Sequence, residues 1–102
     1  MSDHYATTTA RRRFLKELLK ALPGNSGRVQ CIRMLEALRH GPITTNEARR
    51  FLDVFDPASR VRDLRHRFGF EISTNWWESD TERGVRHRVG QYHLMSEKGA
   101  SL

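Results

Sequence analysis

Several features are scarce in this 102-residue chain, and each shortage excludes a class of protein. A single cysteine, Cys31, rules out a disulfide within the chain and fits a reducing compartment. No apolar run approaches the ~20 residues that a membrane-spanning helix needs, and the first residues lack the apolar segment of a signal peptide. We therefore expect one small cytoplasmic domain with no membrane partner.

Catalytic and metal-binding patterns are also missing. The five histidines are not spaced as zinc ligands, and Cys31 has no second thiol to share a metal with. Gly24 and Gly27 are not followed by the Lys-Ser/Thr of a phosphate-binding loop. No Ser/His/Asp or Cys/His arrangement has supporting context. The sequence therefore predicts no enzyme, no metal site and no cofactor.

Positive charge is what the chain has in excess. Lys and Arg number 18 against 12 Asp and Glu, which gives a formal net charge of +6 and a pI near 10.4. All but three of the 18 are arginine. A small, strongly basic domain favours a polyanionic partner: DNA, RNA or a membrane surface. Arginine suits bidentate contacts to guanine edges and phosphates better than lysine does.

Residues 43–72 are the stretch around which the chain is organised. Thr44 and Glu47 have the spacing of a capping box, in which each side chain bonds the other residue's backbone N–H. Apolar residues then follow at i, i+3 and i+4, which is one face of a helix: Ala48, Phe51 and Leu52. This helix has about two turns, so it must lean on neighbouring elements to be stable.

A second helix of this stretch begins at Asp56, because Asp is a good N-cap and Pro57 suits the first helical position. We expect it to stop at Gly69, in the left-handed conformation that ends many helices. At about 100° per residue, its apolar residues predict one buried side: Val61, Leu64 and Phe68. The opposite face carries the candidates for contacts to base edges: Ser59, Arg62, Asp63 and His66.

The basic side chains near that face suggest a second kind of contact. Arg65 lies beside the apolar side, and we interpret it as structural or phosphate-directed. A merely solvated helix is the alternative for the whole face, but such a helix more often mixes Lys with Glu at i, i+4. The candidates for contacts to a DNA backbone, drawn from the whole chain, are Thr45, Arg49, Arg60, Arg67, Arg83, Arg86 and Arg88.

The N-terminal part is predicted to be a flexible arm followed by an amphipathic helix over about residues 9–22. Its apolar stripe is typical of a core contact, although a homodimer seam is an alternative: Phe14, Leu15, Leu18, Leu19 and Leu22. The arm, ahead of the arginines at 11–13, is either a minor-groove arm or a frayed end. After a break at 23–27 a further helix runs to His40. We expect residues 1–26 to form the arm and helix, 27–95 the compact domain, and 96–102 a loose tail.

Two strands are expected near the C-terminus. Residues 70–74 alternate apolar and polar, and a return strand spans about 85–95. Val89 and Tyr92 differ in parity along that strand, so we expect a bulge at Gly90 to bring them to one face. Between the strands, Trp76 and Trp77 are predicted to be an interaction point, by stacking on exposed bases or by anchoring a protein partner. We expect one of the two to pack at the strand end instead.

These motifs together resemble a known family. The residues that carry the resemblance are Thr44-Thr45-x-Glu47-Ala48, Ser59-Arg60-Val61-x-Asp63-Leu64-Arg65, Gly69-Phe70-x-Ile72-x-Thr74, Gly84 and Tyr92-x-Leu94. The pattern is similar to small winged helix-turn-helix domains of phage, prophage and bacterial regulators, over about residues 27–95. It implies an α+β fold: a three-helix core, a two- to three-stranded antiparallel sheet and, here, an extra N-terminal helix. It also implies that the third core helix enters the major groove while the hairpin wing lies over the backbone or minor groove.

Two functions follow from this pattern. The first is sequence-specific binding of double-stranded DNA by a transcriptional regulator or accessory protein of phage or mobile-element origin, in the bacterial cytoplasm or nucleoid. The alternative is a winged helix that binds another protein through its tryptophans, because acids near Trp76 (Glu78, Asp80, Glu82) depart from the basic wings that grip DNA. Salt dependence separates them, because phosphate contacts weaken steeply with salt.

Overall fold

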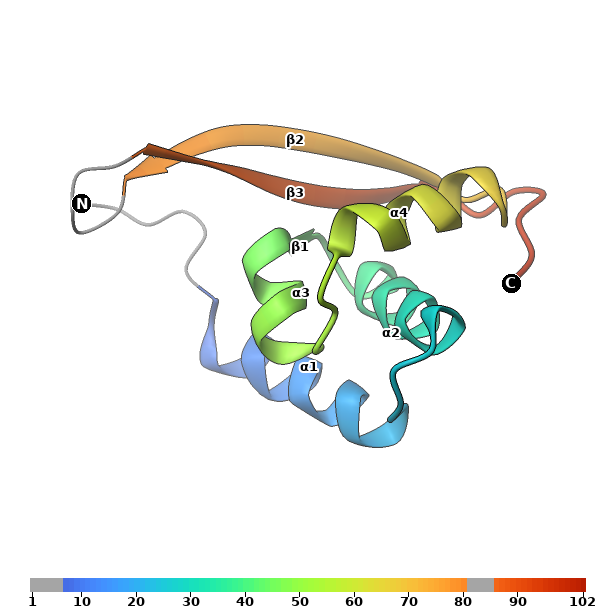
Figure 1. The fold of residues 1–102 in the computed structure, drawn as a ribbon, viewed down its shortest axis with the longest axis horizontal. Helices are drawn as coiled ribbons and strands as arrows, with labels where there is room; N and C mark the ends of the chain where they lie inside the picture. The colour runs from blue at the N-terminus through green and yellow to red at the C-terminus, as the bar shows by residue number, and fades with distance from the viewer. Residues whose placement is uncertain (1–6, 81–85) are drawn as a thin grey trace.

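The computed structural model of the chain describes residues 7–80 and 86–102, except for the side chains of residues 77, 79, 80, 86 and 87. Its elements follow in the order α1 (Thr9–Ala21), α2 (Gly27–Arg39), β1 (Ile43–Thr44), α3 (Thr45–Phe51), α4 (Pro57–His66), β2 (Glu71–Asp80) and β3 (Arg86–Ser96) (Figure 1). Within these described ranges, no helix has the length and apolar character needed to cross a membrane.

The helices form one body and the long hairpin of β2 and β3 lies across it, with its far end extending past α3 (Figure 1). The sheet is antiparallel with the order β1-β3-β2, so β3 is its central strand. Ile43 of β1 lies opposite Tyr92, and Ile72 of β2 lies opposite Leu94. The expected α+β architecture, with an extra helix before a three-helix core and a small antiparallel sheet, is therefore confirmed.

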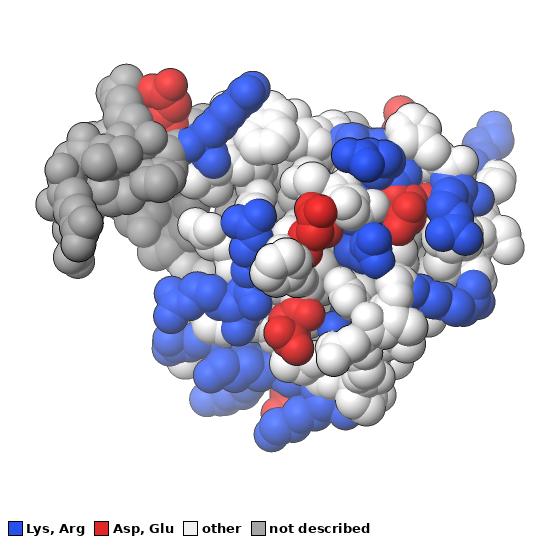
Figure 2. Space-filling model, in the orientation of Figure 1, with Lys and Arg blue, Asp and Glu red and all other residues white. Residues whose placement is uncertain are grey.

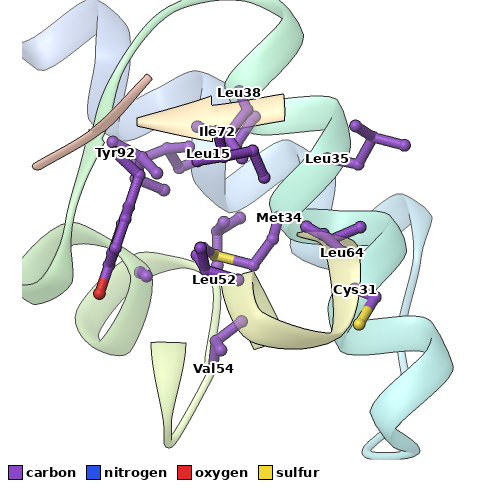
Figure 3. Close-up of a cluster of buried hydrophobic side chains, with 14 of the residues drawn as sticks. Leu15, Cys31, Met34, Leu35, Leu38, Leu52, Val54, Leu64, Ile72 and Tyr92 are labelled. Carbon is purple, nitrogen blue, oxygen red and sulfur yellow. The ribbon is translucent and has the colours of Figure 1, made fainter. Parts of the chain in front are cut away.

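The hydrophobic core lies between the helices and the inner face of the sheet (Figure 3). Each element except the two-residue β1 was expected to contribute an apolar stripe, and β1 adds the fully buried Ile43. Burying one such aliphatic side chain contributes about 1.5–3 kcal/mol. Leu15 of α1 is fully buried in the same cluster, with Phe14 and Leu18 packed against it. Helix α1 is thus part of the packed body, and the core alternative for its stripe is the one that the structure realises.

A charged residue, Arg33 of α2, is buried inside this body. Its guanidinium donates to four backbone carbonyls, of Leu22 and Gly24 at 2.8 Å, Leu52 at 2.9 Å and Asp53 at 3.3 Å. These oxygens lie just after α1 and α3, where helices leave carbonyls unsatisfied and carry partial negative charge. Burial lowers the pKa of the Arg33 guanidinium, and the nearby Asp53 carboxylate acts against that change. Arg33 therefore joins the ends of two helices to a third.

Arg11, the first of the three arginines at 11–13, also bonds backbone carbonyls, at the C-terminal end of α2. Its Nη2 donates to the carbonyl oxygens of Ala37, Gly41 and Pro42 at 3.3, 3.2 and 2.9 Å. Burial is the main cause that lowers the pKa of Arg11. The arm that we expected before the triplet lies outside the described residues up to position 6, but Thr7 already donates to Glu47 Oε2 at 2.9 Å. Arg11 itself serves the fold.

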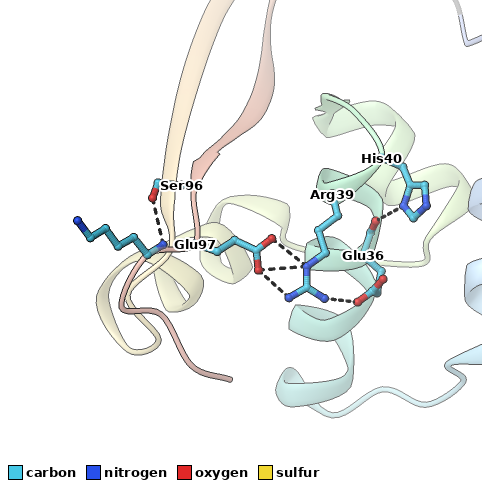
Figure 4. Close-up of polar contacts among 6 residues, drawn as sticks. Glu36, Arg39, His40, Ser96 and Glu97 are labelled. Atoms are coloured by element: carbon cyan, nitrogen blue, oxygen red, sulfur yellow. Dashed lines mark hydrogen bonds and ion pairs between the residues drawn. The ribbon is translucent and has the colours of Figure 1, made fainter.

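The last residues contact the core, contrary to the expectation of a loose tail. The Ser101 N–H donates to the Phe68 carbonyl at 2.9 Å, and Ala100 and Leu102 pack against the core cluster. Glu97 bonds Arg39 of α2, with one oxygen 2.7 Å from Nη2 (Figure 4). These contacts cross more than 30 residues of sequence, which is why local patterns did not indicate them. The division at residues 26 and 95 itself stays a prediction.

The bulge expected at Gly90 is wrong. The register runs without interruption through Asn75 opposite Gln91, Trp76 opposite Gly90 and Trp77 opposite Val89, and the irregularity lies at Glu71/Ile72 instead. Gly90 lets two side chains approach the strand closely, because an added Cβ would lie 3.0 Å from Trp76 Cζ3 and 3.2 Å from Thr45 Oγ1. Val89 and Tyr92 are both buried, but on opposite faces of the strand.

Candidate nucleic-acid interface

Helix α3 begins with the capping box that its sequence predicts. Thr44 Oγ1 accepts the Glu47 N–H at 3.0 Å, and Glu47 Oε1 accepts the Thr44 N–H at 2.9 Å. The next residue, Thr45, donates its hydroxyl to the Gly90 carbonyl at 3.3 Å and is half-buried. This bond holds the start of α3 against β3, so the hydroxyl of this backbone-contact candidate is already engaged within the fold.

The turn between α3 and α4 sets the angle of the second helix. Asp53 has φ of 52°, a left-handed conformation that Asp tolerates better than most residues. The Val54 N–H donates to the Ala48 carbonyl at 3.0 Å, and Val54 is fully buried. Phe55 turns outward and is 88% exposed, while its carbonyl accepts from Arg49 Nε at 3.3 Å. The turn is thus fixed from inside and presents an aromatic ring outside.

Helix α4 starts at the predicted cap. Asp56 Oδ1 accepts the Ser59 N–H at 3.2 Å, and Oδ2 accepts the Ser59 hydroxyl at 2.6 Å. The hydrogen bond from the Ser59 hydroxyl is the main cause that lowers the pKa of Asp56. Ser59, a predicted base-contact residue, therefore has its hydroxyl proton committed to the cap and can offer a base only its lone pairs.

The outer face of α4 divides its candidates into paired and unpaired side chains. Asp63 and Arg60 form an ion pair at 3.4 Å. Arg62 and His66 are exposed, and neither has a partner among residues 7–80 and 86–102. They are four residues apart and so lie one turn apart on one side of the helix. Of the four base-contact candidates, these two are free to meet a ligand.

The flanking arginines of α4 differ from one another. Arg65 donates from Nε to the Ile72 carbonyl at 2.8 Å and from Nη2 to Thr74 Oγ1 at 2.7 Å, so it joins α4 to β2. Arg60 lies against the start of α2, where a Cβ on Gly27 would be 2.5 Å from Nη1. Its buried Nε has no hydrogen-bond partner within the described part of the chain. Arg67 is exposed, 5.4 Å from the ring of Phe68. Only Arg67 extends freely towards solvent.

The hairpin presents an aromatic and a cation together. Trp76 is 49% exposed, and the Arg88 guanidinium lies 4.7 Å from its ring centroid, within the range of a cation–π contact. Both side chains lie on the face of the hairpin that carries Gly90 and Tyr92. The side chains of Trp77 and Arg86, and the whole of Arg83, lie outside the described residues, so these candidates rest on the sequence alone.

Two parts of the exposed surface were not singled out from the sequence. One is Phe55. Its exposure could have been expected from the sequence, because Phe55 is an apolar residue that lies just before the Asp56 cap and does not continue the buried stripe of α3. The second lies over α1 and α3, where Lys and Arg atoms gather with few acidic ones among them (Figure 2). Among the Lys and Arg residues of α1 and α3, only Arg49 was predicted from the sequence to be a site residue.

One comparison with known proteins gives a match. A family model described as a winged helix-turn-helix domain matches residues 29–97, from the first turn of α2 to the residue after β3. No curated protein and no solved structure matches the chain. The matched region contains all of the described elements after α2 and all but the first two residues of α2, and it leaves out α1.

Proposed function

The chain belongs to the family of winged helix-turn-helix domains, and from that premise we propose that it binds double-stranded DNA in a sequence-specific manner. Helix α4 enters the major groove, which is about 12 Å wide and admits a helix. The hairpin of β2 and β3 lies over the adjacent backbone. The observation that carries this proposal is the pair of exposed, unpartnered side chains Arg62 and His66 on a helix that is held at its start by Asp56 and near its end by Arg65.

The individual roles follow from what each side chain already contacts. Arg62 is our main base reader, because its guanidinium has no other bond and can address guanine O6 and N7 together. His66 reads a neighbouring base, while Ser59 and Asp63 act as acceptors from cytosine or adenine amino groups. The exposed ones among the backbone-contact candidates meet phosphates: Arg49, Arg67 and Arg88.

The biological setting belongs to the same proposal. We infer a transcriptional regulator or an accessory protein of a phage or mobile element, acting in a bacterial cytoplasm or nucleoid. A homodimer through α1 would read a palindromic site. Because Leu15 packs inside the chain, such a dimer would have to use the half-buried Leu19 and Leu22. Light scattering at micromolar concentration tests this part, and a monomer there would remove the dimer and the palindrome.

A protein partner is the second candidate, and the exposure of Trp76 is the observation that favours it. Tryptophan and arginine are the residues most enriched at the centres of protein interfaces, and Trp76 and Arg88 lie together on the hairpin. In this case the basic helix would guide an acidic partner. Such an interface depends on apolar burial and would weaken little with salt.

The test is an NMR titration with a random-sequence duplex at low and then at moderate salt. We expect shifts at residues 59–67 and at Arg88 that fade as salt rises, because counterion release dominates such binding. On a site found by selection, Arg62→Ala should then cost about 1–3 kcal/mol, roughly 5- to 150-fold in Kd, and relax the specificity. Lys98→Ala serves as the control, because Lys98 is an exposed cation beyond the hairpin. Residues 59–67 that stay unshifted while the protein is folded would overturn the DNA proposal.

A further inference from the structure

We propose that a second basic surface, formed by Arg12 and Lys16 of α1 with Arg49 and Arg50 of α3, binds phosphates of the same duplex beyond the site that α4 contacts. We call it the α1–α3 basic surface. This inference rests on the proposed function and deepens it, because it adds to the DNA footprint a helix that lies outside the matched family region.

Two of the four side chains, one from each helix, meet over one aromatic ring. Lys16 Nζ lies 6.0 Å and Arg50 Cζ lies 5.3 Å from the ring centroid of Phe51, at the end of α3. Arg12 is four residues before Lys16, which places it one turn away on the same side of α1. All four cations are exposed, and Lys and Arg atoms cover this part of the molecule in Figure 2.

The surface adjoins the start of α4. Arg49 donates from Nε to the carbonyl of Phe55 at 3.3 Å, and Phe55 directly precedes the Asp56 cap of α4. Cations therefore follow one another from Arg49, beside the Asp56 cap, across α3 to Lys16 of α1. A duplex with its major groove on α4 would continue its backbone along this track, which is why we assign the surface to the same duplex and not to a second one.

The two charges on α1, Arg12 and Lys16, stand where they cost the fold stability, whereas Arg49 and Arg50 lie in the last turn of α3, where the helix dipole favours them. Cations in the N-terminal half of α1 oppose the helix dipole, and no acidic residue occupies its first turn. Arg12 and Lys16 repel each other at i, i+4. Throughout the described ranges, no Asp or Glu lies within ion-pair distance of the four side chains, whereas the neighbouring Lys20 pairs with Glu17 at 3.6 Å. A bound polyanion would relieve each of these repulsions.

The surface fits phosphates better than it fits an acidic protein. Interfaces with proteins are centred on apolar or aromatic anchors that become buried on binding. The aromatic ring at the centre of this surface, Phe51, is already only 8% exposed beneath its two cations. What remains outside is charge and hydrogen-bond donors, which match a sugar-phosphate backbone.

The experiment compares two variants that each remove two positive charges. Arg12→Gln/Lys16→Gln alters the proposed surface, and Arg28→Gln/Lys98→Gln removes two exposed cations elsewhere. Glutamine keeps helix propensity, and circular dichroism checks that both variants fold. Binding to a random duplex of about 24 base pairs, twice the protein's 41 Å length at 3.4 Å per pair, is measured across a range of salt. We expect the slope of log K against log salt to fall by about 1.8 for the first variant, at 0.9 per lost contact, and to change little for the second.

The outcomes separate this inference from the proposed function. Equal slopes for the two variants, while Arg62→Ala still weakens binding to the selected site, would overturn the α1–α3 surface and leave the α4 proposal standing. A wild-type protein with no salt-sensitive affinity for the duplex would overturn both. The stoichiometry is measured in parallel by sedimentation with the duplex in excess: one duplex per protein is expected, and two would overturn the assignment to a single duplex.

Discussion

The seam between α1, α2 and α3 and the outer face of α4 use arginine in opposite ways. In the seam, Arg11 and Arg33 direct their guanidinium groups at backbone carbonyls where helices and turns end; Arg33 is buried and Arg11 is half-buried. On α4, Arg62 is exposed and bonds nothing in the described part of the chain. The difference teaches that the arginine excess of the sequence is not a measure of the charge offered to a ligand. Which arginines bind outward is decided by where unsatisfied carbonyls lie.

The largest expected effect tests the seam itself. Arg33→Met should destabilise the fold by about 3 kcal/mol or more, because each buried carbonyl left without a donor costs about 1–3 kcal/mol. Urea unfolding followed by circular dichroism measures the change. The exposed Arg28 on the same helix is the matched control, and Arg28→Met should stay within about 0.5 kcal/mol. Equal unfolding midpoints for both variants would mean that the buried Arg33 contributes no more to stability than the exposed Arg28.

Arg65 allows the same comparison within α4, because it bonds β2 while Arg62 and Arg67 on the same helix are exposed. Arg65→Met removes the bonds to the Ile72 carbonyl and the Thr74 hydroxyl. We expect a loss of about 1–2 kcal/mol, at the lower end for charged hydrogen bonds because the side chain is half-buried. Arg67→Met, two residues along the helix and exposed, should leave the unfolding free energy unchanged within about 0.5 kcal/mol. A loss of the same size at Arg67 would contradict the assigned roles.

The cap of α4 gives a smaller effect with a pH signature. Asp56→Ala should cost about 1 kcal/mol, whereas Asp56→Asn keeps an acceptor and should cost less. Because hydrogen bonding lowers the pKa of Asp56 in the fold, its stabilisation is present above the ordinary pKa of 3.8. That stabilisation is lost as pH falls through the lower, folded value. The stability advantage of the wild type over Asp56→Asn should therefore vanish in acid, and a difference that persists there would show that the carboxylate charge is not its source.

The smallest expected effect concerns a pair outside both regions. Arg39 and Glu97 join α2 to the segment after β3 on the exposed surface (Figure 4), and exposed ion pairs contribute only about 0.2–1 kcal/mol. Glu97→Gln should lower stability by no more than this at low salt, and the difference from wild type should disappear at ~1 M salt because the charges are screened. A loss that salt leaves intact would indicate that Glu97 fixes the chain through packing.

The sequence alone predicted those features of the fold that depend on residues close together along the chain. The capping box of Thr44 and Glu47, the cap at Asp56 and the left-handed Gly69, with φ of 84°, depend on residues a few positions apart. The apolar periods likewise predicted the buried sides of the helices. The winged helix-turn-helix family, and with it the layout of α4 and the hairpin, followed from these signals.

The sequence alone did not predict contacts between residues that lie far apart along the chain. The carbonyl partners of Arg33 lie 9 to 20 residues away, and those of Arg11 lie 26 to 31 away. The bulge predicted at Gly90 is wrong because β3 alternates without interruption there. A glycine is needed at this position because the Trp76 ring and Thr45 approach the strand closely, and no local pattern contains that contact. Within the site, the sequence identified the outer face of α4 but could not separate the committed Ser59 and Arg60 from the free Arg62, because that depends on neighbours in space.

The two residues of β1 have a consequence for how the chain folds. The hairpin of β2 and β3 closes locally, but β1 reaches the same sheet only when Ile43 meets Tyr92, a separation of 92 − 43 = 49 residues. The entropy lost in closing a loop grows with its length, and such long-range pairings slow folding. We expect the helices and the hairpin to form early and the β1–β3 pairing to close the domain last. In kinetic terms, mutations at Ile43 should accelerate unfolding far more than they slow folding.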